Sequence, residues 1–267
     1  MVISRNQKGV LYTRTNAMRD EQIKVKSLGK AMRILECFIG RGELGVTEIS
    51  SMLGLGKSNV HDILSTFITL GYVEQNKNTE KYRLGYRILE LSHSLTSNIG
   101  FRKTVYPHMK QLADEFGEIV YLGVPENFDV IYLDAAYPGH EFMTRAMLGD
   151  RAHMYCTGIG KAMLSCMGRT LWEQLIKLPL EAYTPMTITD PQKLIAELEE
   201  IRQKGYAVDN MEHEHGVRCV GVPILNSRNE LAAGISISAP SPRMDEEKTL
   251  YYAHRLREIA KIVGIYF

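Results

Sequence analysis

The 267-residue sequence has no long apolar run, and this absence excludes a large class of proteins. No segment approaches the roughly 18 consecutive apolar residues that a membrane-spanning helix requires. The first 22 residues also lack the apolar stretch of a secretory signal peptide. We therefore expect a protein that does not bind to or cross a membrane and that acts in the cytoplasm.

Cysteine is scarce, and its spacing excludes two further classes. The four cysteines are scattered and form no C-x-x-C pair, which argues against a disulfide framework and a structural zinc site: Cys37, Cys156, Cys166 and Cys219. His213 and His215 are close together in "EHEH", but no third ligand follows at the spacing of a zinc signature. We expect a solvated loop there, with no metal and no cofactor.

A strong net charge is also missing, because the whole chain carries only +1. The charge is nevertheless unevenly distributed. Residues 1–85 hold 13 Lys and Arg against 8 Asp and Glu, whereas residues 86–267 hold 19 against 23. The basic residues 1–85, followed by an acidic remainder, indicate that the N-terminal part of the chain binds a polyanion.

The front of the chain has the outline of a winged helix-turn-helix over residues 24–83, behind a flexible basic tail at 1–23. A first helix is predicted from Ser27, a short second helix begins at a Thr47 cap and ends at Gly54, and a third follows Gly56. "YVEQ" and "KYRL" then predict two short strands around a polar turn. The first and third helices carry these apolar stripes: Leu28, Ala31, Met32, Leu35, Phe38 and Ile39, then Val60, Ile63, Leu64, Phe67 and Leu70.

"LGLGKSNVH", residues 53–61, is compatible with a phosphate-binding loop or with the turn of a helix-turn-helix. A phosphate loop needs a glycine five residues before Gly56 and a strand before it, but Ser51 stands there in a helical pattern. We therefore favour the helix-turn-helix. Its recognition helix would reach base edges and phosphates, and its wing the flanking backbone, with these residues: Lys57, Ser58, Asn59, His61 and Ser65, then Lys77, Lys81 and Arg83.

The remainder predicts a linker and a second domain. Leu84, Ile88, Leu91 and Leu95 form a narrow stripe on a helix over 84–98, suited to pairing with its own copy. Residues 99–267 alternate helices with two hairpins, which predicts an α+β domain with a mostly antiparallel sheet. In "GISISA", strand alternation turns Ser236 and Ser238 away from the apolar residues, either toward a ligand or toward solvent.

Three stretches resemble the IclR family of bacterial transcription factors: "LGLGKSNVHDILSTFITLGYVEQNKNTEKYRLGYRILELSHSL", "TGIGKAML" and "GYAVDNMEHEHGVRCVGVPILNSRNELAAGISISAPSPRM". The resemblance spans about residues 25–264 and implies a winged helix-turn-helix that dimerises through its linker helix. It also implies a GAF-like effector domain and a dimer or dimer of dimers. Gly56 and Asp62 depart from this family, which often has Ser and Arg there.

The resemblance also implies an effector site at Gly158, Ile159, Asp209, Cys219, Ser236 and Ser238. Helix amides at Gly158 and Ile159 would favour an anion. We therefore predict a regulator, a repressor of a catabolic operon, that binds a palindromic double-stranded operator and senses a small carboxylate. A hydroxy or oxo acid is favoured, with an aromatic acid against Met154 and Tyr155 as the alternative. A ligand-binding protein that does not bind DNA, or a thiol enzyme using Cys219, His215 and Asp209, is the other function left open.

Overall fold

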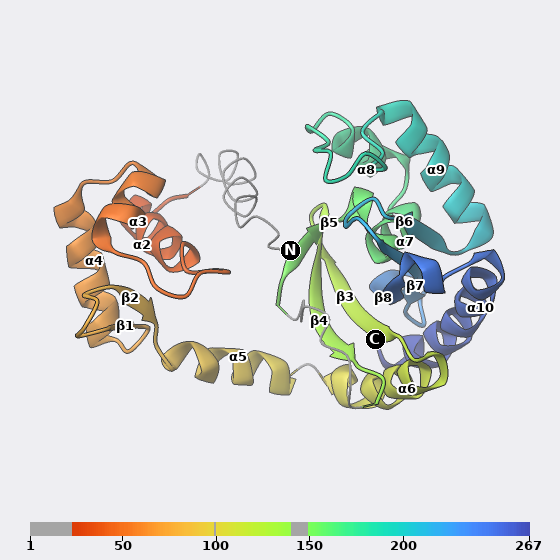
Figure 1. Cartoon of the computed structure of the whole chain (residues 1–267), viewed down its shortest axis with the longest axis horizontal. Helices are drawn as coiled ribbons and strands as arrows, with labels where there is room; N and C mark the ends of the chain where they lie inside the picture. Colours follow the sequence, from red (N-terminus) through yellow and green to blue (C-terminus); the bar gives the residue numbers. More distant parts are fainter. Residues whose placement is uncertain (1–22, 99, 140–148) are drawn as a thin grey trace. The chain divides into compact units, whose positions relative to one another are not determined.

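The computed structural model describes residues 23–98, 100–139 and 149–267. Contacts divide the chain into two units, residues 1–98 and 99–267, and each is described by itself (Figure 1). The predicted basic tail lies outside the described residues except for Ile23.

The first unit contains three helices, a two-stranded hairpin and a further helix. The elements are α2 (Lys26–Glu36), α3 (Val46–Leu53), α4 (Lys57–Thr69), β1 (Val73–Gln75), β2 (Tyr82–Leu84) and α5 (Arg87–Asn98). The strands pair antiparallel, with Val73 opposite Leu84. Helices α2, α3 and α4 and the hairpin enclose one buried core, made of Ile34, Cys37, Phe38, Leu44, Ile49, Val60, Leu64, Phe67, Val73 and Tyr82.

Three details of the first unit differ from the sequence predictions. Helix α2 and the turn after it bury Ile34 and Phe38, whereas Leu28, Met32 and Ile39 are exposed, because this segment carries two overlapping apolar faces and only one packs. Gly45, not Thr47, precedes α3, and its amide donates to Glu48 Oε2 at 2.7 Å. Helix α5 begins at Arg87 rather than at 84, because Leu84 belongs to β2.

The second unit is a mixed α+β domain around one antiparallel sheet. Its elements are α6 (Gly100–Phe116), β3 (Ile119–Glu126), β4 (Asp129–Ala136), β5 (Arg151–His153), η1 (Met154–Cys156), α7 (Gly158–Cys166), α8 (Arg169–Leu175), α9 (Pro191–Lys204), β6 (Ala207–Asn210), β7 (Val217–Leu225), β8 (Leu231–Pro240), η2 (Ser241–Arg243), α10 (Glu246–Val263) and η3 (Gly264–Tyr266). The six strands lie in the order β5-β4-β3-β8-β7-β6, and every neighbouring pair is antiparallel.

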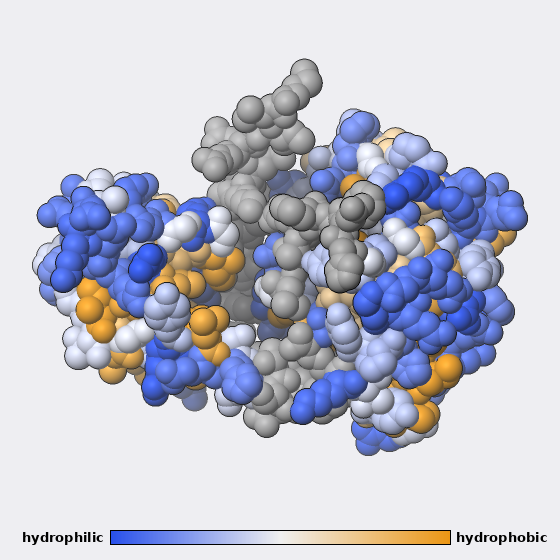
Figure 2. All heavy atoms as spheres, turned by 60° about the horizontal axis from the view of Figure 1, so that its bottom comes forward, coloured by the Kyte–Doolittle hydropathy of each residue, from blue (hydrophilic) through white to orange (hydrophobic). Residues whose placement is uncertain are grey.

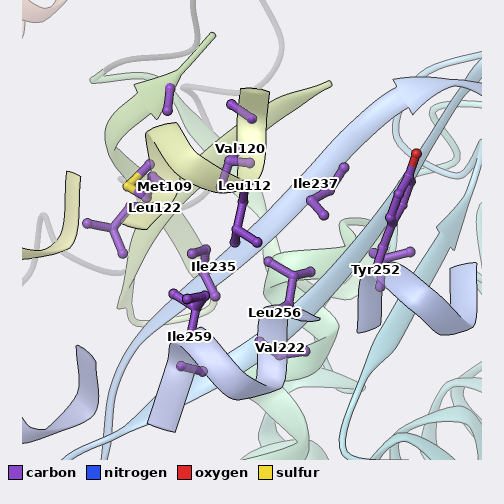
Figure 3. Close-up of a cluster of buried hydrophobic side chains, with 14 of the residues drawn as sticks. Met109, Leu112, Val120, Leu122, Val222, Ile235, Ile237, Tyr252, Leu256 and Ile259 are labelled. Carbon is purple, nitrogen blue, oxygen red and sulfur yellow. The ribbon is translucent and has the colours of Figure 1, made fainter. Parts of the chain in front are cut away.

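Helices cover both faces of the sheet, which gives the unit three layers (Figure 1). On one face, α6 and α10 pack against Val222, Ile235 and Ile237 in a continuous apolar core (Figure 3). On the other face, a second core includes Met154 and Ile159 together with Trp172 of α8 and Leu198 of α9. Since side chains of a strand alternate between faces, Ser236, between Ile235 and Ile237, points toward the face that α7 covers.

Candidate functional sites

The turn between α3 and α4 leaves the first amides of α4 without a side-chain cap. Gly54 ends α3 in the left-handed conformation with φ 63°, which glycine adopts without strain. Ser50 Oγ donates to the Leu55 carbonyl at 2.6 Å and stabilises the turn. Gly56 precedes α4 with extended backbone and has no side chain to accept from the helix amides. These amides, together with the helix dipole, form a site for an anion beside Lys57.

The five residues predicted to read DNA on α4 are all exposed: Lys57, Ser58, Asn59, His61 and Ser65. Two further hydroxyls of this face are used locally. Thr66 Oγ1 donates to the Asp62 carbonyl at 2.9 Å, and Thr69 Oγ1 donates to the Ser65 carbonyl at 3.0 Å. The polar groups that α4 presents outward are therefore concentrated in its first two turns.

Two of the three predicted wing cations lie beside carboxylates that the sequence patterns did not indicate. Lys81 Nζ is 3.1 Å from Glu48 Oε2, and Arg83 donates to Glu74 Oε2 from Nη2 at 3.0 Å and from Nε at 3.2 Å. The Gly45 amide and Lys81 lower the pKa of Glu48. Lys77 is exposed in the turn between the strands. Exposed pairs of this kind contribute little free energy, so a phosphate can compete for the cations.

A cavity of about 470 Å³ lies in the second unit over the α7 face of the sheet. All six residues predicted for an effector site line it: Gly158, Ile159, Asp209, Cys219, Ser236 and Ser238. The strand register explains this, because Ile119, Ser238, Cys219 and Asp209 lie opposite one another in a row across β3, β8, β7 and β6. Their side chains consequently share one face of the sheet.

The N-terminus of α7 is pressed against the sheet above this row. A Cβ atom on Gly158 would lie 3.1 Å from the Cys219 carbonyl oxygen, and one on Gly221 would lie 2.5 Å from Gly158 backbone atoms. A side chain at Gly221 would collide with this backbone, so glycine there permits the close approach. Thr157 caps the helix by accepting from the Gly160 amide at 3.2 Å. The amides of Gly158 and Ile159 have no partner within the helix, and both residues line the cavity.

Two buried carboxylates line the cavity, and of these Glu118 is paired with Arg243, whereas Asp209 has only 2% of its surface exposed. Its Oδ1 accepts from the Glu212 amide at 2.6 Å. Burial and the nearby Glu212 carboxylate raise the pKa of Asp209 to about 7. The group therefore gains or loses its proton near neutral pH, unlike an ordinary aspartate.

Behind Asp209 lies a buried ion pair that sequence reasoning missed. Lys161 on α7 has no exposed surface, and its Nζ lies 2.6 Å from Glu212 Oε1 and 3.0 Å from Glu197 Oε1. Burial opposes the charge, but the two carboxylates raise the pKa of Lys161 and keep it protonated. Glu212 is itself buried, so "EHEH" is not simply the solvated loop that we expected.

The remaining cavity lining combines aromatic rings with charged groups. Tyr121 and Tyr132 line it with their rings 5.4 Å apart, and Arg243 lies there with its Nη2 2.9 Å from Glu118 Oε2. Tyr121 lies opposite Ser236 in the neighbouring strand β8, a long-range pairing that left no signal in the sequence. Met154 and Tyr155, the predicted apolar wall, are buried in the core beneath and do not line the cavity.

The described chemistry does not favour the thiol-enzyme alternative. Burial and the Asp209 charge raise the pKa of Cys219 well above its usual range, and its thiol lies 3.4 Å from Ser238 Oγ as a donor. A thiol rather than a reactive thiolate results. His215 is exposed and does not line the cavity. Within residues 23–98, 100–139 and 149–267, no cluster of three or more His, Cys, Asp or Glu could hold a metal ion.

Two family models match the sequence and together span most of it. The model for the bacterial transcriptional regulator IclR C-terminal domain matches residues 93–264, and the model for the IclR helix-turn-helix domain matches residues 27–77. This chain belongs to the IclR family of bacterial transcriptional regulators. Its helix-turn-helix unit is accordingly a DNA-binding unit, and its second unit is the kind that binds small-molecule effectors in IclR regulators.

Named IclR-family relatives are regulators and not enzymes. The regulator KdgR of Escherichia coli is 32% identical over 251 residues, covering 93% of this chain and 95% of its own length. The regulator XynR of the same organism is 29% identical over 236 residues, covering 88% and 94%. This chain is a DNA-binding transcriptional regulator of the same type.

Solved IclR structures share the fold. An IclR regulator from Alicyclobacillus acidocaldarius superposes with a TM-score of 0.81 at 25% identity, covering 91% of this chain and 98% of that one. An IclR homologue from Microbacterium hydrocarbonoxydans, complexed with 4-hydroxybenzoate, superposes with a TM-score of 0.77 at 25% identity, covering 89% and 97%. In the described part of this chain, no helix has the length and hydropathy to cross a membrane.

Proposed function

We propose that this regulator is a repressor of a catabolic operon, acting in the cytoplasm, whose DNA binding responds to a small carboxylate held in the second unit. The observation that carries the proposal is the cavity, where Gly158 and Ile159 at the start of α7 lie over Asp209, Cys219, Ser236 and Ser238. Donors at a helix start, two hydroxyls and a volume of about 470 Å³ fit a small polar acid.

The proposed DNA interface is the first two turns of α4 and the wing. The exposed side chains of Ser58, Asn59 and His61 are short enough to reach base edges in a major groove. Lys57 and the uncapped amides behind Gly56 would bind phosphate, with Ser65 further along the exposed face of the helix. Lys77, Lys81 and Arg83 would contact the flanking backbone, with the last two leaving Glu48 and Glu74 for phosphate.

The proposed assembly is a homodimer, or a dimer of such dimers, on a palindromic operator. Leu91 of the predicted stripe supports this, since it is 54% exposed on helix α5, whereas Ile88 is half-buried and Leu84 belongs to β2. Hydrophobic residues also reach the visible surface of the first unit in Figure 2. Large apolar side chains left in water on a helix indicate a partner surface. The side chain of Leu95, also predicted in this stripe, lies outside the described residues.

The proposed effector is a monocarboxylate with hydroxyl or keto oxygens, such as a sugar acid or a 2-oxo acid. Asp209 would accept from a ligand hydroxyl, and Ser236 and Ser238 would bind the remaining oxygens. A small aromatic acid is the second candidate. It is supported by the rings of Tyr121 and Tyr132 and by the relative that is complexed with 4-hydroxybenzoate.

The test of this function uses the full chain in two assays. Retardation of DNA fragments carrying the upstream region of its own operon should be sequence-selective and weakened by salt. Thermal-shift screening should then identify acids, rather than amines or neutral sugars, as stabilising compounds. Binding of uncharged or cationic compounds alone would overturn the effector class, and turnover of an ester or thioester probe without DNA binding would favour an enzyme.

A further inference from the structure

The described lining of the cavity is acidic, although the proposed effector is an anion. Three carboxylates line it, at Glu118, Asp209 and Glu214, against one guanidinium, at Arg243. That guanidinium lies 2.9 Å from Glu118 and is therefore already engaged. An incoming carboxylate would meet helix amides and hydroxyls, but also, if Asp209 were ionised, a negative charge with no cation in contact among its described hydrogen bonds and ion pairs.

The position of Asp209 makes it the carboxylate that an effector would feel most. It lies in the row with Cys219 and Ser238, beneath the start of α7, whereas Glu214 is exposed and Glu118 lies against Arg243. The nearest buried cation, Lys161, lies against Glu212 and Glu197 and is not among the residues that line the cavity. A negative charge on the buried Asp209 carboxylate would repel an anion at short range, because little water is present to screen it.

The titratable and charged groups around Asp209 come from every element packed against it. They are Glu212, His213 and Glu214 from the loop after β6, Lys161 from α7, Glu197 from α9 through Lys161, Cys219 from β7, Cys156 from η1 and Tyr132 from β4. Burial keeps the thiols of Cys156 and Cys219 and the phenol of Tyr132 protonated, because it raises the pKa of each. Glu118 is paired with Arg243, so the Asp209 carboxyl and the side chains of His213 and Glu214 are the groups in the lining to separate by experiment.

We propose that the pocket binds its carboxylate effector together with one proton, which the Asp209 carboxylate takes up from solvent. This inference rests on the proposed function. The protonated Asp209 carboxyl group then donates an O–H···O hydrogen bond to the effector carboxylate, and the two groups share a single negative charge. Short hydrogen bonds between a carboxylic acid and a carboxylate are among the stronger ones in proteins. Protonation thus converts the Asp209 side chain from a carboxylate that repels the effector into a hydrogen-bond donor to it.

Regulation follows from the same arrangement. With the pKa of the empty site at about 7, half of the Asp209 groups are protonated at neutral pH. If only the protonated form binds the acid, affinity falls about tenfold from pH 6 to pH 8 and levels off below pH 6. The effector response of the regulator would therefore be stronger in a mildly acidified cell.

The experiment is isothermal titration calorimetry on the full chain at pH 6, 7 and 8, with D-gluconate, pyruvate and 4-hydroxybenzoate as probes. These acids remain ionised throughout this range, so they contribute no pH dependence of their own. Each titration is repeated in phosphate and in Tris, whose different ionisation enthalpies count the protons taken up. We expect the uptake for a bound acid to approach one proton at pH 8 and to fall toward zero at pH 6.

Three variants separate Asp209 from its neighbours. Asp209→Asn keeps the shape of the protonated group and should remove both the pH dependence and the proton uptake. Glu214→Gln and His213→Gln change the other titratable groups beside it and should keep both. If Asp209→Asn binds too weakly to measure, the wild-type proton count decides.

The outcomes distinguish this inference from the proposed function. An acid that binds with the same Kd at all three pH values, or with no proton uptake at pH 8, overturns the inference and leaves an acid-sensing regulator. Retention of the pH dependence in Asp209→Asn, or its loss in His213→Gln alone, also overturns it. If none of the acids binds and neutral compounds do, the proposed effector class fails as well.

Discussion

At the scale of single residues, the second unit buries ionisable side chains of a kind that usually remain at a protein surface. Lys161, Glu212 and Asp209 are all less than 5% exposed. Thr187 Oγ1 donates to the Glu212 carbonyl at 2.6 Å, so the loop before α9 and the Lys161 ion pair restrain the same turn. That turn carries Asp209 at one end and His213 and Glu214 at the other, which line the cavity.

Replacement of Lys161 by Met should lower the free energy of unfolding by about 3–5 kcal/mol, because Glu212 would remain as a buried charge without its partner. Urea unfolding measures the change. Lys177→Met, at an exposed position, is the matched control and should have almost no effect. The double variant Lys161→Met with Glu212→Leu should recover part of the loss. A wild-type midpoint in the single variant would contradict the role of the pair.

Ser238→Ala should desensitise the regulator to its effector while ligand-free DNA binding stays close to wild type. The Ser238 hydroxyl lies in the cavity next to Cys219, and it belongs to the second unit and not to the helix-turn-helix unit. Loss of one hydrogen bond to a charged ligand costs about 1.5–3 kcal/mol, or roughly ten- to a hundredfold in Kd. Calorimetry with a bound acid measures it, and Ser227→Ala in the exposed β7–β8 turn serves as control. An unchanged Kd would remove Ser238 from the site.

At the scale of elements, α4 combines a packed face and a reading face in one helix. Val60, Leu64 and Phe67 bury one side, and the opposite side exposes polar groups from Lys57 to Ser65. Because Gly56 provides no cap, the helix start is completed by whatever anion approaches it. A DNA phosphate bound at these amides would therefore stabilise α4 more than it would stabilise a helix whose first amides are already capped.

Lys57→Ala and Asn59→Ala should weaken DNA binding in different ways. Loss of the Lys57 contact with phosphate should weaken binding to all DNA sequences similarly. It should also reduce the slope of log K against log salt concentration by about the value of one phosphate contact. Loss of the Asn59 contact with a base edge should cost about 1–3 kcal/mol of binding free energy on the preferred site alone, and sequence specificity should relax. Selection of binding sites from random DNA compares the two, with Lys30→Ala on α2 as an exposed control. An unaltered preferred site in Asn59→Ala would refute its base-reading role.

Most elements of the chain could be predicted from periodicity and turn residues. Helix α4 and the strand pairs β3–β4 and β7–β8 lie where apolar spacing and polar turns indicated them. The alternation in "GISISA" places Ser236 and Ser238 on the cavity face. Helix α2 shows the limit of this approach. Two apolar stripes overlap there, and only the packing of α3 and α4 selects the one that contains Ile34.

The cavity chemistry could be predicted only in part, for a physical reason. Backbone alternation determines which residues of one strand share a face, but not which strands are neighbours. The sheet order brings Ile119 and Tyr121 of β3 beside Ser238 and Ser236, although more than 100 residues separate them in sequence. The partnership of Lys161 with Glu212 likewise depends on long-range packing and leaves no local pattern.

At the scale of the whole molecule, the proposed function couples the two units through the proposed dimer. A palindrome places two half-sites about 34 Å apart, one turn of DNA, and two recognition helices must match that spacing. An effector in the second unit can act on DNA only by shifting the balance between arrangements of the assembly that bind DNA differently. The linker helix α5 joins the two units in sequence, so its exposed leucines bear directly on this coupling.

Leu91→Asp should abolish operator binding while the second unit still binds its acid. Leu91 is 54% exposed, and in the proposed dimer a carboxylate there would be buried against its own copy without a cation. The control is His93→Asp, which lies nearly half a helical turn from the stripe and makes a similar change in charge. Equilibrium sedimentation at micromolar concentration should give a dimer or tetramer for the wild type and for His93→Asp, and a smaller species for Leu91→Asp. Calorimetry should give the same acid affinity for all three proteins. A monomeric wild type that still binds the palindrome, or a Leu91→Asp protein that keeps its mass and its operator, would show that assembly occurs through another surface.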